Sequence, residues 1–260
     1  MKRVAIVIPA YNEENRISKT LKTYLSYFKE LKKKKELDFV IIVVLNACKD
    51  NTKGVVSGFK DKEIEMLDFK RGGKGFAITE GFKHAIKKNW DLIGFIDADM
   101  STPPSAFYGL VRHINDYDGI IADRWDKKSK ITPKQSLVRR FISRIYNMLV
   151  RSLFFFNHRD TQCGAKLFRK ELLEKIISNI GSSEWGFDVD LLFYVRREKG
   201  KVKSIPTEWH DEVGSHINLK KTPVTMFLSA IRLRLIHSPL RFLVRAYTLL
   251  PEKLKFHKMI

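Results

Sequence analysis

Two aspartates separated by a single residue follow a short apolar run. Residues 92–96 form the run, and Asp97 and Asp99 come directly after it. A short, continuous apolar run predicts a strand that is buried on both faces. Two carboxylates this close repel each other unless a cation lies between them, and oxygen ligands suit Mg²⁺ or Mn²⁺, often shared with a substrate diphosphate. The pair therefore indicates a divalent-metal site, although Asp-x-Asp also occurs in solvated turns.

The elements that must position this pair alternate along the first 125 residues. Alternation of strand-like and helix-like patterns predicts an α/β fold, with a mostly parallel sheet and helices on both faces. In such folds, ligands bind at the carboxyl ends of the strands. The expected strands are 4–8, 39–45, 64–69, 92–96 and 119–122, and the expected helices are 15–34, 52–59, 74–88 and 104–115.

Polar residues follow other predicted strands. After the first strand, Tyr11 can stack on a nucleobase and Glu13 can accept hydrogen bonds from ribose hydroxyls, although acidic residues here also suit the start of a helix. Lys74 follows two glycines at the start of a helix, where the backbone and the helix dipole favour an anion. These residues indicate a nucleotide and its phosphates as the ligand.

The charge composition limits the classes of partner. The chain has 49 Lys and Arg against 29 Asp and Glu, a formal net charge of +20, which predicts an anionic partner such as nucleic acid, an anionic membrane or a nucleotide sugar. Nucleic acid is not expected, because no binding motif for it is recognisable and the basic residues are spread along the chain. Cys48 and Cys163 lie far apart, which predicts a reducing compartment and no disulfide framework.

Two long segments combine apolar residues with arginines. The first is 133–156 and the second is 224–250, in which Pro239 should break or kink the helix. Such helices lie in membrane interfaces, or pack on a core with a solvated outer face. No apolar run reaches the roughly 18 residues that a span requires, and the chain opens on a strand rather than a signal peptide. A soluble or peripheral protein is therefore expected.

A series of motifs in the same order resembles the family 2 glycosyltransferases with the GT-A fold, over roughly residues 1–236. The later motifs look like the polyprenyl-phosphate (dolichyl-phosphate) sugar synthases, particularly the glucosyltransferase branch. The motifs are Pro-Ala-Tyr-Asn-Glu at 9–13, Lys-Arg-Gly-Gly-Lys-Gly at 70–75, Asp-Ala-Asp at 97–99, Asp-Thr-Gln-Cys-Gly-Ala-Lys-Leu-Phe at 160–168, Glu-Trp-Gly-Phe-Asp-Val-Asp at 184–190 and Glu-Trp-His-Asp-Glu-Val-Gly-Ser at 208–215.

The resemblance implies roles for individual residues. The metal ligands would be Asp97, Asp99 and His210, with Asp99 the more direct, and the catalytic residues Asp97, Asp99 and Asp188. The acceptor phosphate would be held by Arg124, Arg139 and Arg140. The nucleotide sugar would be bound by Pro9, Tyr11, Glu13, Asn46, Lys74, Asp97 and Trp185. Relatives commonly read Asp-Asp-Gly-Ser-x-Asp after the second strand, where this chain reads Leu45 to Asp50, so the base, uracil or guanine, stays open.

The implied activity is inverting, metal-dependent transfer of a hexose from a UDP- or GDP-linked sugar to a polyprenyl phosphate. The protein is expected to lie peripherally at the cytoplasmic face of the cell membrane, with a GT-A domain at 1–220 and membrane-interfacial helices at 221–260. A hydroxyl acceptor on a glycan or lipid-linked oligosaccharide is the nearest alternative. An ionised phosphate needs little deprotonation, so Asp188 acts either as a general base on a hydroxyl or as a group that orients the sugar.

Overall fold

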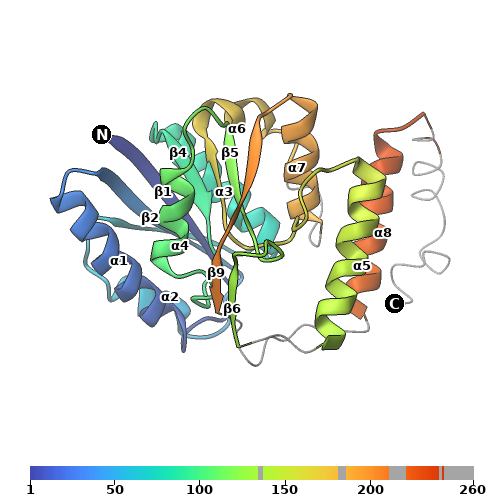
Figure 1. Ribbon diagram of the computed structural model, residues 1–260. Helices are drawn as coiled ribbons and strands as arrows, with labels where there is room; N and C mark the ends of the chain where they lie inside the picture. The colour runs from blue at the N-terminus through green and yellow to red at the C-terminus, as the bar shows by residue number, and fades with distance from the viewer. Residues whose placement is uncertain (134–136, 181–185, 211–220, 240–241, 243–260) are drawn as a thin grey trace.

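The computed structural model of the protein describes residues 1–133, 137–180, 186–210, 221–239 and 242, and omits the side chains of residues 137–140 and 221–226 (Figure 1). A seven-stranded sheet forms its centre, in the order β3-β2-β1-β4-β7-β5-β8. All neighbouring strands are parallel except β7, which runs antiparallel to both β4 and β5. The strands are β1 Lys2–Ala10, β2 Leu37–Asn46, β3 Ile64–Phe69, β4 Leu92–Phe95, β5 Gly119–Asp123, β7 Lys166–Arg169 and β8 Val202–Pro206.

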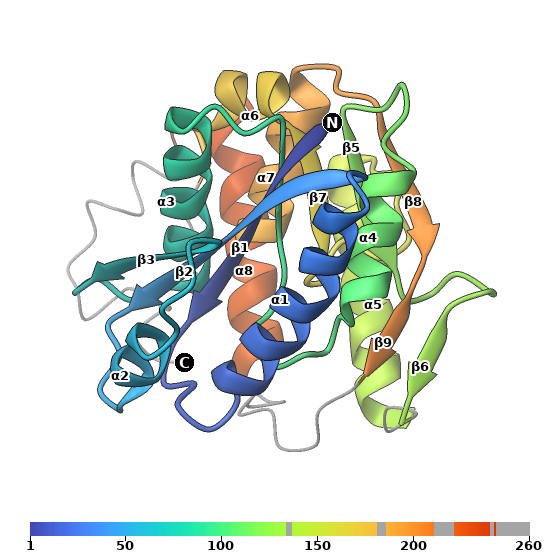
Figure 2. The same ribbon diagram turned by 90° about the vertical axis from the view of Figure 1, so that its left-hand side faces the viewer.

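Helices cover both faces of this sheet (Figures 1 and 2). On one face, Tyr24, Phe28 and Phe107 pack with strand residues into the first buried cluster, which belongs to α1, α2 and α4. On the other face, Phe82 and Leu191 belong to a second cluster that includes α3, α5, α6, α7 and α8. Those helices are α1 Ile17–Lys33, α2 Thr52–Ser57, α3 Lys74–Lys87, α4 Pro104–Arg112, α5 Leu137–Phe154, α6 Lys170–Ile176, α7 Phe187–Arg197 and α8 Lys221–Ile236.

The apolar runs explain the central strands. Residues 4–10 and 39–46 are buried throughout, as expected for parallel strands covered on both faces. The predicted α/β fold, with a mostly parallel sheet between two helical layers, is confirmed. Each predicted strand and helix of the first 125 residues is present, with ends that differ by no more than a few residues.

A second, two-stranded sheet joins distant parts of the chain. β6 (Lys130–Thr132) pairs in parallel with β9 (Glu208–His210). Next to the main sheet, α5 and α8 lie side by side (Figure 1). The second apolar segment forms a helix that ends at Ile236, three residues before Pro239, in agreement with the expected break. Ala230 and Leu233 of this helix are buried, whereas Leu228 and Ile236 are exposed. Its apolar residues are therefore not gathered on one buried face. Residues 243–250 of that segment lie outside the described residues.

Candidate active site

One edge of the sheet collects the polar residues. β1, β2, β4 and β5 all end there, at Ala10, Asn46, Phe95 and Asp123. Because β7 runs the opposite way, its first residue, Lys166, lies at the same edge. Segments that follow β1, β2 and β4 therefore meet the segment that precedes β7.

Asp97 lies between a lysine and a glycine from two other elements. Its Oδ1 pairs with the Nζ of Lys74, the first residue of α3. On the other side, a Cβ added at Gly164 would come 2.0 Å from Oδ2 of Asp97. Burial alone would lower the pKa of Lys74, but the facing carboxylates of Asp97, Asp188 and Asp99 outweigh it and raise the pKa to about 12. Lys74 is therefore a fixed positive charge at this edge.

Asp99 shapes the turn that connects β4 to α4. Its Oδ1 accepts a hydrogen bond from the Ser101 amide at 2.9 Å, and the carbonyl of Ser101 accepts one from the His210 amide at 2.8 Å. The backbone of β9 is thereby joined to the Asp-x-Asp turn. The His210 ring faces Glu208, with 3.3 Å between Nε2 and Oε1. The structure thus brings the backbone of His210 to the turn that carries Asp99, and no direct bond joins their side chains.

Glu13 faces the two aspartates from the end of β1. Its carboxylate pairs with Arg16 at 2.7 and 2.9 Å, and its amide donates to Thr52 Oγ1 at 2.7 Å. Burial raises the pKa of Glu13; Arg16 opposes that shift, whereas Asp99 and Asp97 add to it. Arg16 and Thr52 thus fix Glu13 at a place where the charges of Asp97 and Asp99 affect its pKa.

The other residues predicted for the nucleotide lie at the same edge in different surroundings. Pro9 is buried inside β1, paired with Val44, whereas Tyr11 is 51% exposed. Asn46, at the end of β2, is buried, and its Oδ1 has no hydrogen-bond partner among the described residues. Because buried acceptors are almost always paired, this amide oxygen suits a donor group supplied by a ligand. Trp185 lies outside the described residues.

Asp188 is paired with a residue that we had not predicted for the site. Its Oδ1 accepts from the Nζ of Lys166, which also donates to the Cys163 carbonyl at 2.7 Å and lies 5.3 Å from the centre of the Phe95 ring. Lys166 is fully buried. The available signal was a lysine within the otherwise apolar run 165–168, since lysine is almost never fully buried unless it is paired.

Arg124 also has a carboxylate partner. Its Nε and Nη2 donate to Asp160 at 2.7 and 3.0 Å, and its guanidinium lies 4.9 Å from the centre of the Trp209 ring. Burial raises the pKa of Asp160, but Arg124 outweighs that effect and lowers it. The pair fixes the Asp-Thr-Gln-Cys-Gly loop to the end of β5, so a role for Arg124 at the acceptor phosphate would have to coexist with this ion pair.

The same loop is fastened to α5. The Thr161 amide and hydroxyl both donate to Oδ1 of Asn147, at 2.9 and 2.8 Å, and Asn147 is buried on α5. The backbones of Arg139 and Arg140 lie in the first turn of α5, whereas their side chains lie outside the described part of the structure. The helix that carries these arginines is therefore attached directly to the loop next to Asp97.

Cys163 is fully buried in the first core cluster. Burial raises the pKa of its thiol to about 12. Because the thiolate is the nucleophilic form, Cys163 is a packed residue and not a nucleophile at neutral pH.

The residues at this edge fit a divalent cation that is shared with a substrate. Within the described ranges, no three His, Cys, Asp or Glu side chains are grouped closely enough to hold a metal ion by themselves. Mg²⁺ sites commonly use only one or two carboxylates, with substrate phosphates and water as the other ligands. Asp97 and Asp99 can supply those carboxylates, and only a glycine at position 164 leaves room for the Asp97 carboxylate in its present position. The donor set therefore suits Mg²⁺ or Mn²⁺ together with a diphosphate.

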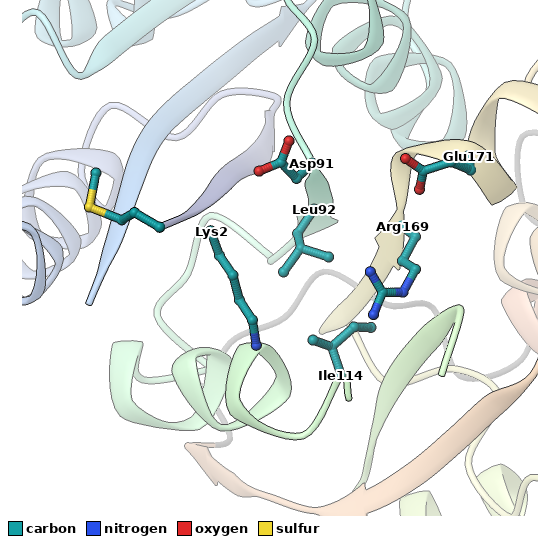
Figure 3. Close-up of a pocket in the computed structure, with 7 residues that line it drawn as sticks. Lys2, Asp91, Leu92, Ile114, Arg169 and Glu171 are labelled. Atoms are coloured by element: carbon teal, nitrogen blue, oxygen red, sulfur yellow. The ribbon is translucent and has the colours of Figure 1, made fainter. Parts of the chain in front are cut away.

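The opposite edge of the sheet contains a pocket of about 410 Å³ (Figure 3). Lys2, Asp91 and Arg169 are among the residues that line it. Arg169 donates to the carbonyl of Tyr117 at 3.0 Å, and Asp91 accepts from the amide of Arg3 at 2.9 Å. None of the residues predicted for the site lines this pocket, so the chemistry indicated by the sequence belongs to the carboxyl edge.

The chain is similar to a known family of sequences. The family model described as glycosyl transferase family 2 matches residues 5–177. A dolichyl-phosphate beta-glucosyltransferase of Trichomonas vaginalis is 30% identical over 245 residues, which cover 90% of this chain and 73% of the relative. The enzymes of the same name from Saccharomyces cerevisiae and Homo sapiens are 28% and 29% identical, covering 90% and 83% of this chain and 75% and 70% of those proteins.

Solved structures share the fold at lower identity. Mannosyl-3-phosphoglycerate synthase from Rubrobacter xylanophilus is 17% identical with a TM-score of 0.67, covering 97% of this chain and 78% of that one. Glucosyl-3-phosphoglycerate synthase from Mycobacterium tuberculosis, solved with Mn²⁺, UDP-glucose and phosphoglyceric acid, is 16% identical with a TM-score of 0.65, covering 90% and 79%.

Proposed function

Because the chain belongs to glycosyl transferase family 2 and has the GT-A fold, we propose that it transfers glucose from a nucleoside-diphosphate sugar to a polyprenyl (dolichyl-type) phosphate, with inversion at the anomeric carbon. The observation that carries this proposal is the similarity to dolichyl-phosphate beta-glucosyltransferases over nine-tenths of the chain, 90% for the Trichomonas vaginalis protein. The carboxylates and lysines at one edge of the sheet supply the chemistry that such a transfer needs.

The donor binds where β1, β2 and β4 end. Asp97 and Asp99, with His210 next to their turn, would hold Mg²⁺ or Mn²⁺, and Glu13 would accept from the ribose. When bound, the ion neutralises the charge that develops on the departing diphosphate. Lys74 contributes a second positive charge, since its pKa of about 12 keeps it protonated. The unpaired Oδ1 of Asn46 is the group that would read the base, uracil or guanine.

The acceptor binds where β5, the Asp160–Gly164 loop and α7 come together. A phosphate monoester is largely ionised near neutral pH, so it attacks without a strong general base. Asp188 then orients the donor sugar and accepts hydrogen bonds from it. Arg139 and Arg140, in the first turn of α5, would pair with the acceptor phosphate, because the planar guanidinium binds two oxygens at once.

A membrane surface would deliver the acceptor. On α5, Phe141 and Met148 are 66% and 59% exposed, and Phe155, just beyond its end, is 66% exposed. Arg144 and Arg151 lie on the same helix, and exposed apolar groups bordered by basic residues suit the interface of an anionic membrane. Of the helices in the described ranges, none is long and apolar enough to cross a membrane. We propose peripheral attachment at the cytoplasmic face as part of this function.

Residues 221–260 form the second part of this proposal. The expected division places the GT-A domain at 1–220 and membrane-interfacial helices at 221–260. The first helix of this segment, α8, packs on α5, the helix that carries the proposed acceptor arginines. Leu228 and Ile236 of α8 are exposed and add to the apolar surface that α5 provides.

The decisive experiment offers radiolabelled nucleotide sugar with Mn²⁺ to three acceptors: polyprenyl phosphate, the free polyprenol and a soluble glycan. Label should enter the organic phase only with the phosphate. Equal transfer to the alcohol, or transfer only to the glycan, would establish the hydroxyl-acceptor alternative instead. A thermal-shift series with UDP- and GDP-linked sugars identifies the donor, because a ligand that binds the native state raises its melting temperature.

Retention of the protein on DNA without any binding of nucleotide sugars would support a nucleic-acid-binding protein, which is the rival from a different class. Membrane binding without any transfer would support a homologue that has lost catalysis. The intact Asp97 and Asp99 argue against that second possibility.

A further inference from the structure

Lys166 is a fully buried charge in the middle of the sheet. It is the first residue of β7, paired across the sheet with Phe95 of β4 and Ile121 of β5, and it is 0% exposed. Taking an ammonium group out of water is strongly unfavourable unless it is paired and hydrogen-bonded. Although β7 is an inner strand of the sheet, Lys166 lies at its first residue, next to the carboxyl ends of β4 and β5 where the site is. This position suggests a reason for its presence beyond packing.

The contacts of Lys166 define one direction for its ammonium group. Nζ donates to the carbonyl of Cys163 at 2.7 Å and pairs with Oδ1 of Asp188, above the face of the Phe95 ring. Asp188 is the second residue of α7. One side chain thus connects the start of β7, the loop before it and the amino end of α7.

Asp188 is connected in turn to the donor side. Its carboxylate raises the pKa of Lys74, together with those of Asp97 and Asp99. A second contact sets the distance between α3 and α7, since a Cβ on Gly75, next to Lys74, would lie 2.7 Å from Cβ of Phe187. The amino ends of these two helices therefore pack directly against each other, and Asp188 faces the group that would receive the diphosphate.

We propose that Lys166 is a positioning residue for Asp188, which it holds through one carboxylate oxygen so that the other, Oδ2, faces the donor sugar. Within the described ranges, Oδ1 receives the Lys166 bond and Oδ2 receives none. This proposal rests on the proposed function, because it takes Asp188 to contact the sugar of the donor. Lys166 itself touches no substrate.

Three variants and their combination test the proposal. Lys166→Met keeps the length of the side chain and removes its charge, Lys166→Arg keeps a cation, and Asp188→Asn removes the negative partner. Leu167→Ala is the matched control, because Leu167 is the next residue of β7, is equally buried, and belongs to the core cluster on the other face of the sheet. The measurements are kcat per folded molecule, KM for the donor and melting temperature.

Lys166→Met is expected to lower kcat at least about tenfold, as Asp188→Asn does, because small displacements of positioned groups are costly for catalysis. In Lys166→Met, KM for the donor should change less than about threefold. Lys166→Arg should recover part of kcat. The double variant Lys166→Met/Asp188→Asn should be no slower than the slower single variant, as expected for residues that act as a unit. Leu167→Ala should lower the melting temperature and keep kcat.

A Lys166→Met protein that melts earlier yet keeps the wild-type kcat would overturn the proposal, and so would losses that multiply in the double variant. If Lys166→Met does not fold, the double variant replaces it, since removal of both charges leaves no unpaired carboxylate. Activity equal to that of Asp188→Asn then supports the proposal, and a further tenfold loss contradicts it. Slow hydrolysis of the nucleotide sugar, measured without acceptor, gives the same comparison if the acceptor proves to be different, so the two failures are distinguishable.

Discussion

The backbone of Gly164 lies against the carboxylate of Asp97, so that a Cβ at position 164 would stand 2.0 Å from Oδ2 and 2.7 Å from Cγ. Real Cβ atoms do not approach this closely, and Asp97 has Lys74 on its other oxygen. The glycine that ends the Asp-Thr-Gln-Cys-Gly motif is therefore required by the Asp-x-Asp motif, which lies more than 60 residues earlier in the chain.

Gly164→Ala tests this relationship. The new methyl group should displace the Asp97 carboxylate from its present position beside Lys74 and lower kcat about 100-fold, the scale expected for a displacement of about 1 Å at a catalytic group. Circular dichroism should stay that of wild type, because the change is confined to a loop. Gly109→Ala is the control, since a Cβ there meets nothing within 4 Å, and it should keep full activity. Equal kcat for both variants would contradict the steric argument.

Asp99→Asn tests the metal site. Loss of one charged ligand should reduce turnover by about two orders of magnitude or more, whereas the fold should persist, because Asn can still accept the 2.9 Å bond from the Ser101 amide. Wild-type activity should disappear in EDTA and return with Mn²⁺ or Mg²⁺. Binding of Mn²⁺ in the presence of the nucleoside diphosphate, followed by electron paramagnetic resonance, gives a second readout. Full turnover in EDTA would rule out the metal.

Replacing Arg139 and Arg140 together by Ala tests the acceptor site. The apparent KM for polyprenyl phosphate should rise at least about tenfold, in line with the loss of charge-assisted hydrogen bonds. Affinity for the donor should barely change, because both residues lie outside the nucleotide motifs of the sequence. Asp188→Asn, by contrast, should lower kcat without altering KM for the acceptor. An unchanged KM in the arginine variant would assign the phosphate to other residues.

The exposed apolar residues of α5 and its end should mediate membrane binding. Wild-type protein should sediment with anionic liposomes at low salt and less at high salt, because salt screens the electrostatic contribution. Changing Phe141, Met148 and Phe155 to Ser should reduce sedimentation at both salt concentrations. Tyr11→Ser, which removes a 51% exposed aromatic residue elsewhere, should sediment like wild type. Equal recovery in the supernatant with and without liposomes would exclude peripheral binding.

Protonation of His158 should lower the free energy of unfolding of the protein at mildly acidic pH. Burial lowers the pKa of His158 below 6.5, with smaller effects of Lys166 and Arg151 in the same direction. Below pH 6.5 the unfolded chain therefore binds a proton that the folded chain does not, and stability decreases as the pH falls toward the folded pKa. The melting temperature of wild type should drop between about pH 7 and about pH 5, and His158→Gln should drop less. Exposed His113→Gln should follow wild type, and parallel curves for all three would refute this assignment.

The sequence was sufficient for the donor half of the molecule. Continuous apolar runs and their polar ends determine β1, β2 and β4, and parallel strands necessarily bring their carboxyl ends together, so Glu13, Lys74 and Asp97 could be grouped without coordinates. The acceptor half was harder to predict. β7 has four residues and β6 and β9 have three, which is too short for a period-2 pattern, so these strands were missed.

Charged partners that are far apart in the chain were also missed. Arg124 was predicted at the acceptor phosphate, yet it meets Asp160, which lies 36 residues away, and Lys166 was not singled out although it meets Asp188, 22 residues away. In each pair the two residues belong to different elements or loops, so only the tertiary fold creates the contact. The motifs contain Asp160, Lys166 and Asp188, but they did not reveal which residues bind each other.

Because β7 runs in the reverse direction, the acceptor segment of the chain can evolve independently of the donor segment. The proposed donor contacts, except those of Trp185, Asp188 and His210, come from residues before 100, whereas Arg124 and the 160–164 loop are reached only after β5. Because β7 starts at the edge where β4 and β5 end, the intervening 40 or so residues can be exchanged or extended without moving the strands that carry the nucleotide. A chimaera that receives this stretch from another relative should change its acceptor and retain its donor.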